Sequence, residues 1–102
     1  MTELEAQFEL AVREACTKAG NLGYFPSYFL QKMTRTGAVT YAKELVVSGE
    51  LQTGLRRLAQ LKALDLSIEH LVARVPRFAS LFTKDQREAA EWRLKQIEAL
   101  RR

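Results

Sequence analysis

Cysteine, proline and histidine are scarce in this chain. Its 102 residues include one cysteine (Cys16), one histidine (His70) and two prolines. A single cysteine excludes a disulfide within the chain and favours a reducing compartment, so we expect a cytoplasmic protein. One histidine and one cysteine, far apart in sequence, cannot supply the ligand set of a structural zinc site. The sequence therefore predicts neither a bound metal nor a cofactor.

Long apolar runs and catalytic signatures are also missing. No stretch of about 18 apolar residues occurs, so we expect no membrane-spanning helix. The N-terminus shows no basic segment followed by an apolar stretch, the pattern of a secretory signal. Neither GxGxxG nor GxxxxGK[ST] is present, which argues against a phosphate-binding loop. The pattern supplies His70 with no matched nucleophile and orienting acid. We therefore expect a protein that is not an enzyme, and infer no small-molecule substrate.

What the sequence does contain is a series of short helical segments with clear punctuation. Apolar residues recur at helical spacing, and breaks separate the segments. The runs Thr2-Glu3-Leu4-Glu5 and Thr83-Lys84-Asp85-Gln86 are capping-box patterns, Ser67 is a good N-cap, and Pro76 stops or kinks a helix. These signals predict an all-α fold, a compact single-core bundle of five or six short helices. We expect one domain spanning residues 1–102.

Two side-chain placements follow from the helical spacing. Cys16 sits at the edge of the apolar stripe of the first segment, which favours a small packed side chain over a reactive thiol. Lys62 falls on the apolar side of its helix. We therefore expect its methylene stem to run along the core while the ammonium group reaches solvent.

An aromatic segment follows the first helix and has two interpretations. It holds Tyr24, Phe25, Tyr28 and Phe29 within six residues. Next to basic side chains, such rings could stack on exposed nucleic-acid bases. They could instead fill the core and anchor the loop. We favour the core interpretation.

The positive charge is concentrated in the second half of the chain. Residues 51–102 hold eleven Lys/Arg and six Asp/Glu, a net charge of +5, whereas the whole chain carries +4. A basic half suggests an anionic partner. The segment 67–82 superficially suggests a helix-turn-helix, but Pro76 lies at its turn and the second helix is too short and apolar. The nucleic-acid alternative therefore depends on phosphate contacts from basic side chains on one face, namely Arg56, Arg57, Arg74 and Arg77.

A tryptophan in the last helical segment suggests a protein partner. Trp92 lies off the inward stripe formed by Ala90, Leu94 and Ile97, among charged residues. An exposed tryptophan surrounded by charges is typical of a binding hot spot. We predict a protein-binding surface of Trp92, Arg93 and Gln96, used for a partner or for self-association. The alternative is that another helix covers Trp92.

The chain from Gly37 onward, together with the aromatic segment, resembles a family of small, largely uncharacterised bacterial helical proteins. The residues that carry the resemblance are Gly37-Ala38-Val39, Ala42, Leu45, Gly54-Leu55-Arg56-Arg57-Leu58, Leu64-Asp65-Leu66-Ser67-Ile68-Glu69, Leu71-Val72, Pro76, Phe78, Leu81-Phe82-Thr83, Ala90 and Arg93-Leu94. The family shows an acidic residue where this chain has Gln86. The resemblance implies a helical fold and a bacterial or phage setting, and it transfers no functional residue. It also raises a third function, a phage-defence or counter-defence component.

Overall fold

All the regular secondary structure in the part of the chain that the structure describes is helical. The computed structural model describes residues 2–48 and 53–100, which form six α-helices and two 3-10 helices with no strand among them. The elements are α1 (Glu3–Asn21), α2 (Ser27–Thr36), α3 (Ala38–Val46), α4 (Thr53–Gln60), η1 (Leu64–Leu66), α5 (Ile68–Ala73), η2 (Pro76–Leu81) and α6 (Lys84–Leu100). The expected all-α bundle of five or six short helices is confirmed.

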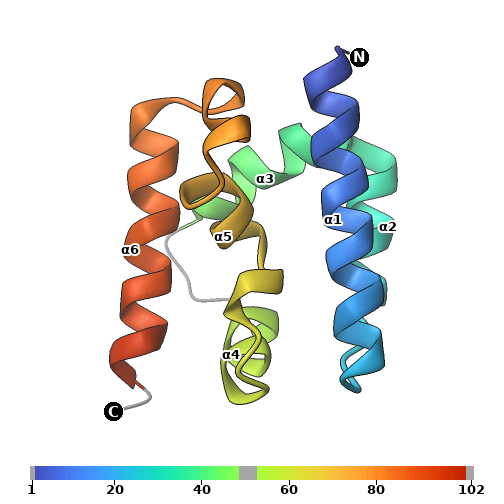
Figure 1. Cartoon of the computed structure of the whole chain (residues 1–102), viewed down its shortest axis with the longest axis vertical. Coiled ribbons are helices and arrows are strands. Elements are labelled where there is room, and N and C mark those ends of the chain that lie inside the picture. Colours follow the sequence, from blue (N-terminus) through green and yellow to red (C-terminus); the bar gives the residue numbers. More distant parts are fainter. Residues whose placement is uncertain (1, 49–52, 101–102) are drawn as a thin grey trace.

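The two longest helices flank the shorter ones. Helices α1 and α6 stand at opposite sides of the molecule, and α3, α4 and α5 lie between them (Figure 1). Helix α5 packs most extensively against α6, whereas α1 packs against α3, η1 and η2. The radius of gyration of 12.6 Å is close to the ~13 Å of a compact domain of this length.

The main core joins α1 to residues of the second half of the chain. Phe8 of α1 is completely buried, and its ring meets Phe78 and Phe82 edge-on at centroid distances of 5.2 and 5.3 Å. Such aromatic pairs are favourable beyond the area that they bury. Around them lie apolar side chains from five α-helices, including Val12, Met33, Ala38, Ala42, Leu45, Val46, Ile68, Leu71, Val72 and Ala90.

The predicted helix starts are confirmed by their hydrogen bonds. The backbone N–H of Glu5 donates to the Thr2 hydroxyl at 3.2 Å, and the Thr2 N–H donates to the Glu5 carboxylate at 3.1 Å. The same reciprocal pair joins Thr83 and Gln86 at 3.1 and 2.9 Å. Ser67 accepts from the N–H of His70 at 3.1 Å. Each cap satisfies end amides that have no partner within the helix.

Two helices end in the same type of left-handed turn. At the end of α1, Gly23 has φ +97°, and Tyr24 N–H donates to Ala19 C=O at 2.9 Å. At the end of α4, Lys62 has φ 58°, and Ala63 N–H donates to Leu58 C=O at 2.8 Å. Both are Schellman motifs. Lys62 therefore ends its helix with an exposed side chain, which corrects the expectation that its stem runs along the core.

Candidate functional site

The outer face of α6 carries the tryptophan that the sequence singled out. Trp92 is 52 % exposed, and Gln96, one turn further along the helix, is also exposed. Arg93 does not belong to this surface, because it is 1 % exposed and points into the protein. Of the three predicted residues, Trp92 and Gln96 therefore lie on the surface and Arg93 does not, and binding through this surface stays a prediction. The position of Arg93 in the sequence, three residues after Ala90 and four before Ile97, already placed it on the inward stripe.

Arg93 forms a buried ion pair with α5. Its Nε donates to Oε2 of Glu69 at 2.9 Å, and both side chains are almost fully enclosed. Its Nη1 lies 3.4 Å from the hydroxyl of Ser48, and its Nη2 has no hydrogen-bond partner among the described residues. Burying two charges is favourable only when they are paired and hydrogen-bonded. This pair therefore fixes α6 against α5, a structural role that the sequence analysis missed.

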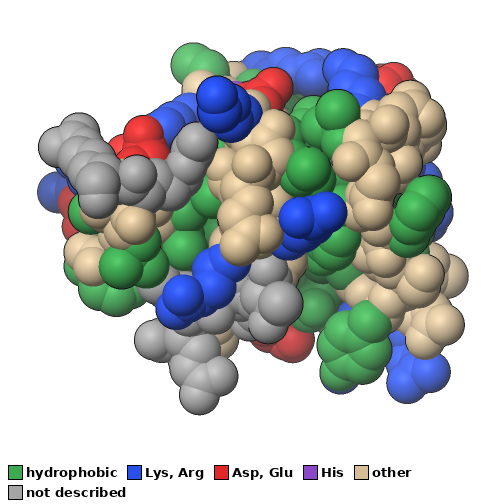
Figure 2. Space-filling model, turned by 90° about the horizontal axis from the view of Figure 1, so that it is seen from below, with side chains coloured by type: hydrophobic (Ala, Val, Ile, Leu, Met, Phe, Trp, Pro, Cys, Tyr) green, Lys and Arg blue, Asp and Glu red, His purple; other side chains and the backbone are tan. Residues whose placement is uncertain are grey.

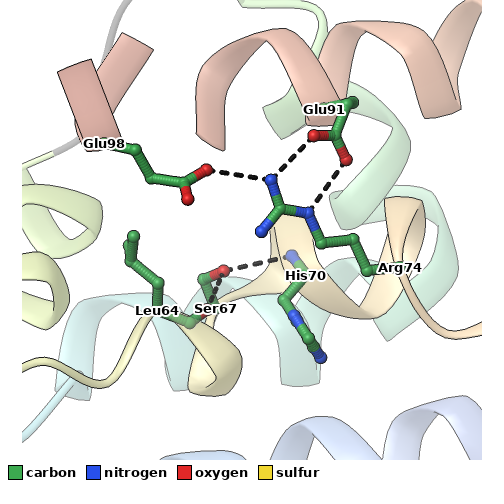
Figure 3. Close-up of polar contacts among 6 residues, drawn as sticks. All are labelled: Leu64, Ser67, His70, Arg74, Glu91 and Glu98. Atoms are coloured by element: carbon green, nitrogen blue, oxygen red, sulfur yellow. Dashed lines mark hydrogen bonds and ion pairs between the residues drawn. The ribbon is translucent and has the colours of Figure 1, made fainter. Parts of the chain in front are cut away.

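Arg74, a predicted nucleic-acid contact, is held by two carboxylates of α6. Its Nε and Nη2 donate to both oxygens of Glu91 at 2.9 and 2.7 Å, and Nη2 also donates to Glu98 at 2.9 Å (Figure 3). These hydrogen bonds raise the pKa of Arg74 and lower the pKa of Glu91. Because two acids surround it, Arg74 offers little positive charge to a phosphate.

The other predicted basic residues differ in how free they are. Arg56 and Arg57 are exposed on α4, where the Arg57 guanidinium donates to Gln60 at 3.3 Å. Arg77 is exposed, and its guanidinium carbon lies 4.4 Å from the ring centroid of the buried Phe78. Of the four arginines, Arg56 and Arg57 are thus exposed without a carboxylate partner among the described residues. Joint action of the four arginines stays a prediction.

His70, the sole histidine, lies in α5 and is partly buried. Its ring points away from Arg74, Glu91 and Glu98 (Figure 3). Among residues 2–48 and 53–100, no group of three or more His, Cys, Asp or Glu side chains could hold a metal ion. In the same part of the chain, no helix is both long and apolar enough to cross a membrane.

The aromatic segment differs most from its predicted placement. Phe25 is 73 % exposed and Tyr28 is 69 % exposed, so the core interpretation is wrong for these two rings. Tyr24 and Phe29 are partly buried and pack against the core. The segment connects α1 to α2 at the lower end of the molecule in Figure 1, and the view from below shows hydrophobic side chains between separate basic ones (Figure 2).

The aromatic segment forms one wall of a cavity of about 300 Å³. Its walls come from α1, the aromatic segment, α3, α4 and the η1–α5 region. Small-molecule pockets in proteins are mostly apolar and begin at about this size. Sequence patterns could not predict this cavity, because its lining residues are spread from position 12 to position 71.

Comparisons with protein-family profiles, with curated proteins and with solved structures find no match to this chain. The resemblance to small bacterial helical proteins stays a prediction.

Proposed function

We propose that the protein is a non-catalytic accessory or regulatory protein that docks onto another protein through the outer face of α6. The observation that carries this proposal is the exposure of Trp92, whose ring lies half in solvent on a regular helix. Tryptophan is strongly enriched among residues that dominate binding energy, and surrounding polar groups exclude water from such contacts. The exposed side chains of Glu88, Lys95 and Gln96 supply this surround.

A rigid helix is a suitable platform for such a contact. Helix α6 packs extensively against α5, and the buried Arg93–Glu69 pair and the ion pairs of Arg74 with Glu91 and Glu98 join the two helices. Its exposed face can therefore meet a partner without first becoming ordered, and this lowers the entropic cost of association. A cytoplasmic bacterial setting is part of the proposal and comes from the cysteine count and the family resemblance.

The test uses the tryptophan both as target and as reporter. The chain has a single tryptophan, so a blue shift of its emission reports burial of Trp92 in a complex. Complexes captured from a native-host lysate should be lost in Trp92→Ala and kept in Leu10→Ala, a matched control that removes an equally exposed apolar side chain from α1. Because Trp92 is a surface residue, its removal should change the free energy of unfolding by no more than about 0.5 kcal/mol. If both variants lose the same complexes, the α6 proposal is wrong.

Nucleic-acid association is a second candidate function, favoured by the exposure of Arg56 and Arg57 on α4. Binding through phosphates weakens steeply as salt rises. Charge reversal at both positions should therefore abolish binding to every DNA or RNA sequence alike. Nuclease treatment of the captured complexes separates this function from protein docking. A phage-defence or counter-defence role has the family resemblance as its sole support.

A further inference from the structure

The cavity walled by the aromatic segment has a mainly apolar lining, and its inner side is buried. This inner side is made by side chains that are almost fully enclosed, and these belong to elements far apart in the sequence: Val12, Ala15, Ala19, Leu55, Leu58 and Ile68. The cavity is open to solvent on one side and measures about 300 Å³ at the meeting point of five segments. This volume is at the lower end of the range of small-molecule pockets.

The polar side-chain groups on its wall are hydroxyls, the Cys16 thiol and one carboxylate that is paired with an arginine. Tyr24 and Tyr41 line the cavity, and burial raises the pKa of both phenols. Glu69 also lines it, but its charge is matched by Arg93 at 2.9 Å. No Lys or Arg is among the described residues of the lining. An anionic ligand would therefore enter without a counter-charge, whereas a neutral one has no charge to remove from water. Tyrosine hydroxyls can donate to and accept from a polar group of the ligand.

The mouth of the cavity carries unusual apolar exposure. Phe25 and Tyr28 both line it, although about 70 % of each side chain is in solvent. Aromatic rings that remain this exposed next to an apolar space gain burial when the space is filled. Gly54 matters for the same wall, because a Cβ at this position would collide with the hydroxyl of Tyr24. The glycine thus permits the close approach of α4 that completes the lining.

We propose that this cavity is a binding site for a small, neutral, mainly apolar molecule that carries one hydrogen-bonding group. Its apolar body would occupy the space between α1 and α4, and the hydroxyls of Tyr24 and Tyr41 would meet its polar group. Phe25 and Tyr28 would pack over it. The site lies away from Trp92, so this inference is independent of docking through α6.

The test is a titration of the full chain with N-phenyl-1-naphthylamine, a neutral fluorophore whose emission rises in apolar surroundings. We expect saturable binding of one molecule per chain. The variant Ala15→Phe, which places a ring inside the cavity, should weaken binding at least tenfold. Trp92→Ala should leave binding unchanged. The anionic analogue 8-anilinonaphthalene-1-sulfonate should bind at least tenfold more weakly than the neutral probe. At a probe concentration a hundred times the Kd, Tm should rise by about 10 °C.

A second measurement keeps the proposal testable if Ala15→Phe fails to fold. In the unmodified protein, amide shift changes on probe addition should cluster at residues 12–28, 41–45 and 54–71, and spare the outer face of α6. Binding that does not saturate would overturn the proposal, as would shifts centred on Trp92. An undiminished affinity in a folded Ala15→Phe variant, or equal affinity for both probes, would also contradict it. None of these results bears on protein capture through Trp92, so the two proposals can fail separately.

Discussion

At the scale of single residues, the least expected feature is a charged pair inside a small core. Arg93 and Glu69 are both almost fully buried, and they lie on neighbouring helices. Removing two charges from water costs several kcal/mol for each ion, and their mutual attraction repays this only with good geometry. The pair therefore contributes little net stability. It makes the packing of α5 on α6 specific, because each charge is tolerable only when the other is in place.

Removing one member of this pair should be far more harmful than removing both. Arg93→Met should lower the free energy of unfolding by about 3–5 kcal/mol, because the Glu69 carboxylate is left buried and uncompensated. The double variant Arg93→Met with Glu69→Met should recover most of this loss, because an apolar pair of similar volume needs no counter-charge. Urea unfolding monitored by circular dichroism measures the free energy of unfolding of the single and the double variant. Equal losses in the single and double variants would show that packing volume, not charge, decides the stability here.

At the scale of helices, the two left-handed turns provide a matched comparison. Gly23 and Lys62 occupy the same position of the same capping motif, but only glycine adopts a positive φ without steric cost. Gly23→Ala should destabilise the protein by about 1 kcal/mol, which is a backbone effect because nothing lies within 4 Å of the new Cβ. Lys62→Gly should stabilise it by about 0.5–1 kcal/mol. Thermal unfolding checks both, and a destabilised Lys62→Gly would mean that the lysine makes a contact of its own.

The ion pairs of Arg74 with Glu91 and Glu98, which join the end of α5 to α6, should make the stability of the protein depend on pH. Hydrogen bonds from Arg74 lower the pKa of Glu91 below its ordinary value of 4.5. A carboxyl whose pKa is lowered by folding stabilises the protein fully above pH 4.5, and this contribution disappears as the pH falls through the lowered value. Arg74→Gln should therefore cost about 1 kcal/mol at pH 7, a modest amount because water screens these side chains. The difference from the unmodified protein should vanish in strong acid and shrink in 1 M salt. A constant difference across the pH range would rule out the ion pair as its cause.

The features that the sequence predicts well are those decided within one or two helical turns. The capping boxes at Thr2 and Thr83 and the N-cap at Ser67 depend on residues three apart, and all three are present. The exposure of Phe25 could not be predicted, because it depends on tertiary packing and not on the spacing of residues within one helix. The cavity could not be predicted for the same reason, because its lining comes from segments far apart in the sequence. Arg93 is an intermediate case: its helical position indicated burial, but a charge there is tolerable only with Glu69, 24 positions earlier.

At the scale of the whole molecule, Phe8 links the beginning of the chain to its end. Its ring packs against Phe78 and Phe82, and through the same cluster α1 is connected to Ala90 of α6. Local contacts cannot replace this link, because each of the short helices is marginal on its own in water. The helices should therefore unfold as one cooperative unit, not as separate halves.

Phe8→Ala tests this cooperativity. Deleting a fully buried ring should cost about 3–5 kcal/mol. Domains of this size have free energies of unfolding of only about 5–15 kcal/mol, so the loss is a large fraction of the total. Native-state hydrogen exchange shows which helices lose amide protection. If the protein is one unit, the slowest amides of α6 should lose as much protection as those of α1, although α6 lies on the opposite side of the molecule (Figure 1). Phe8→Leu, which leaves a much smaller void, should affect both helices proportionally less. Loss of protection confined to α1 would show instead that the first helix can detach while α5 and α6 remain folded around their buried ion pair.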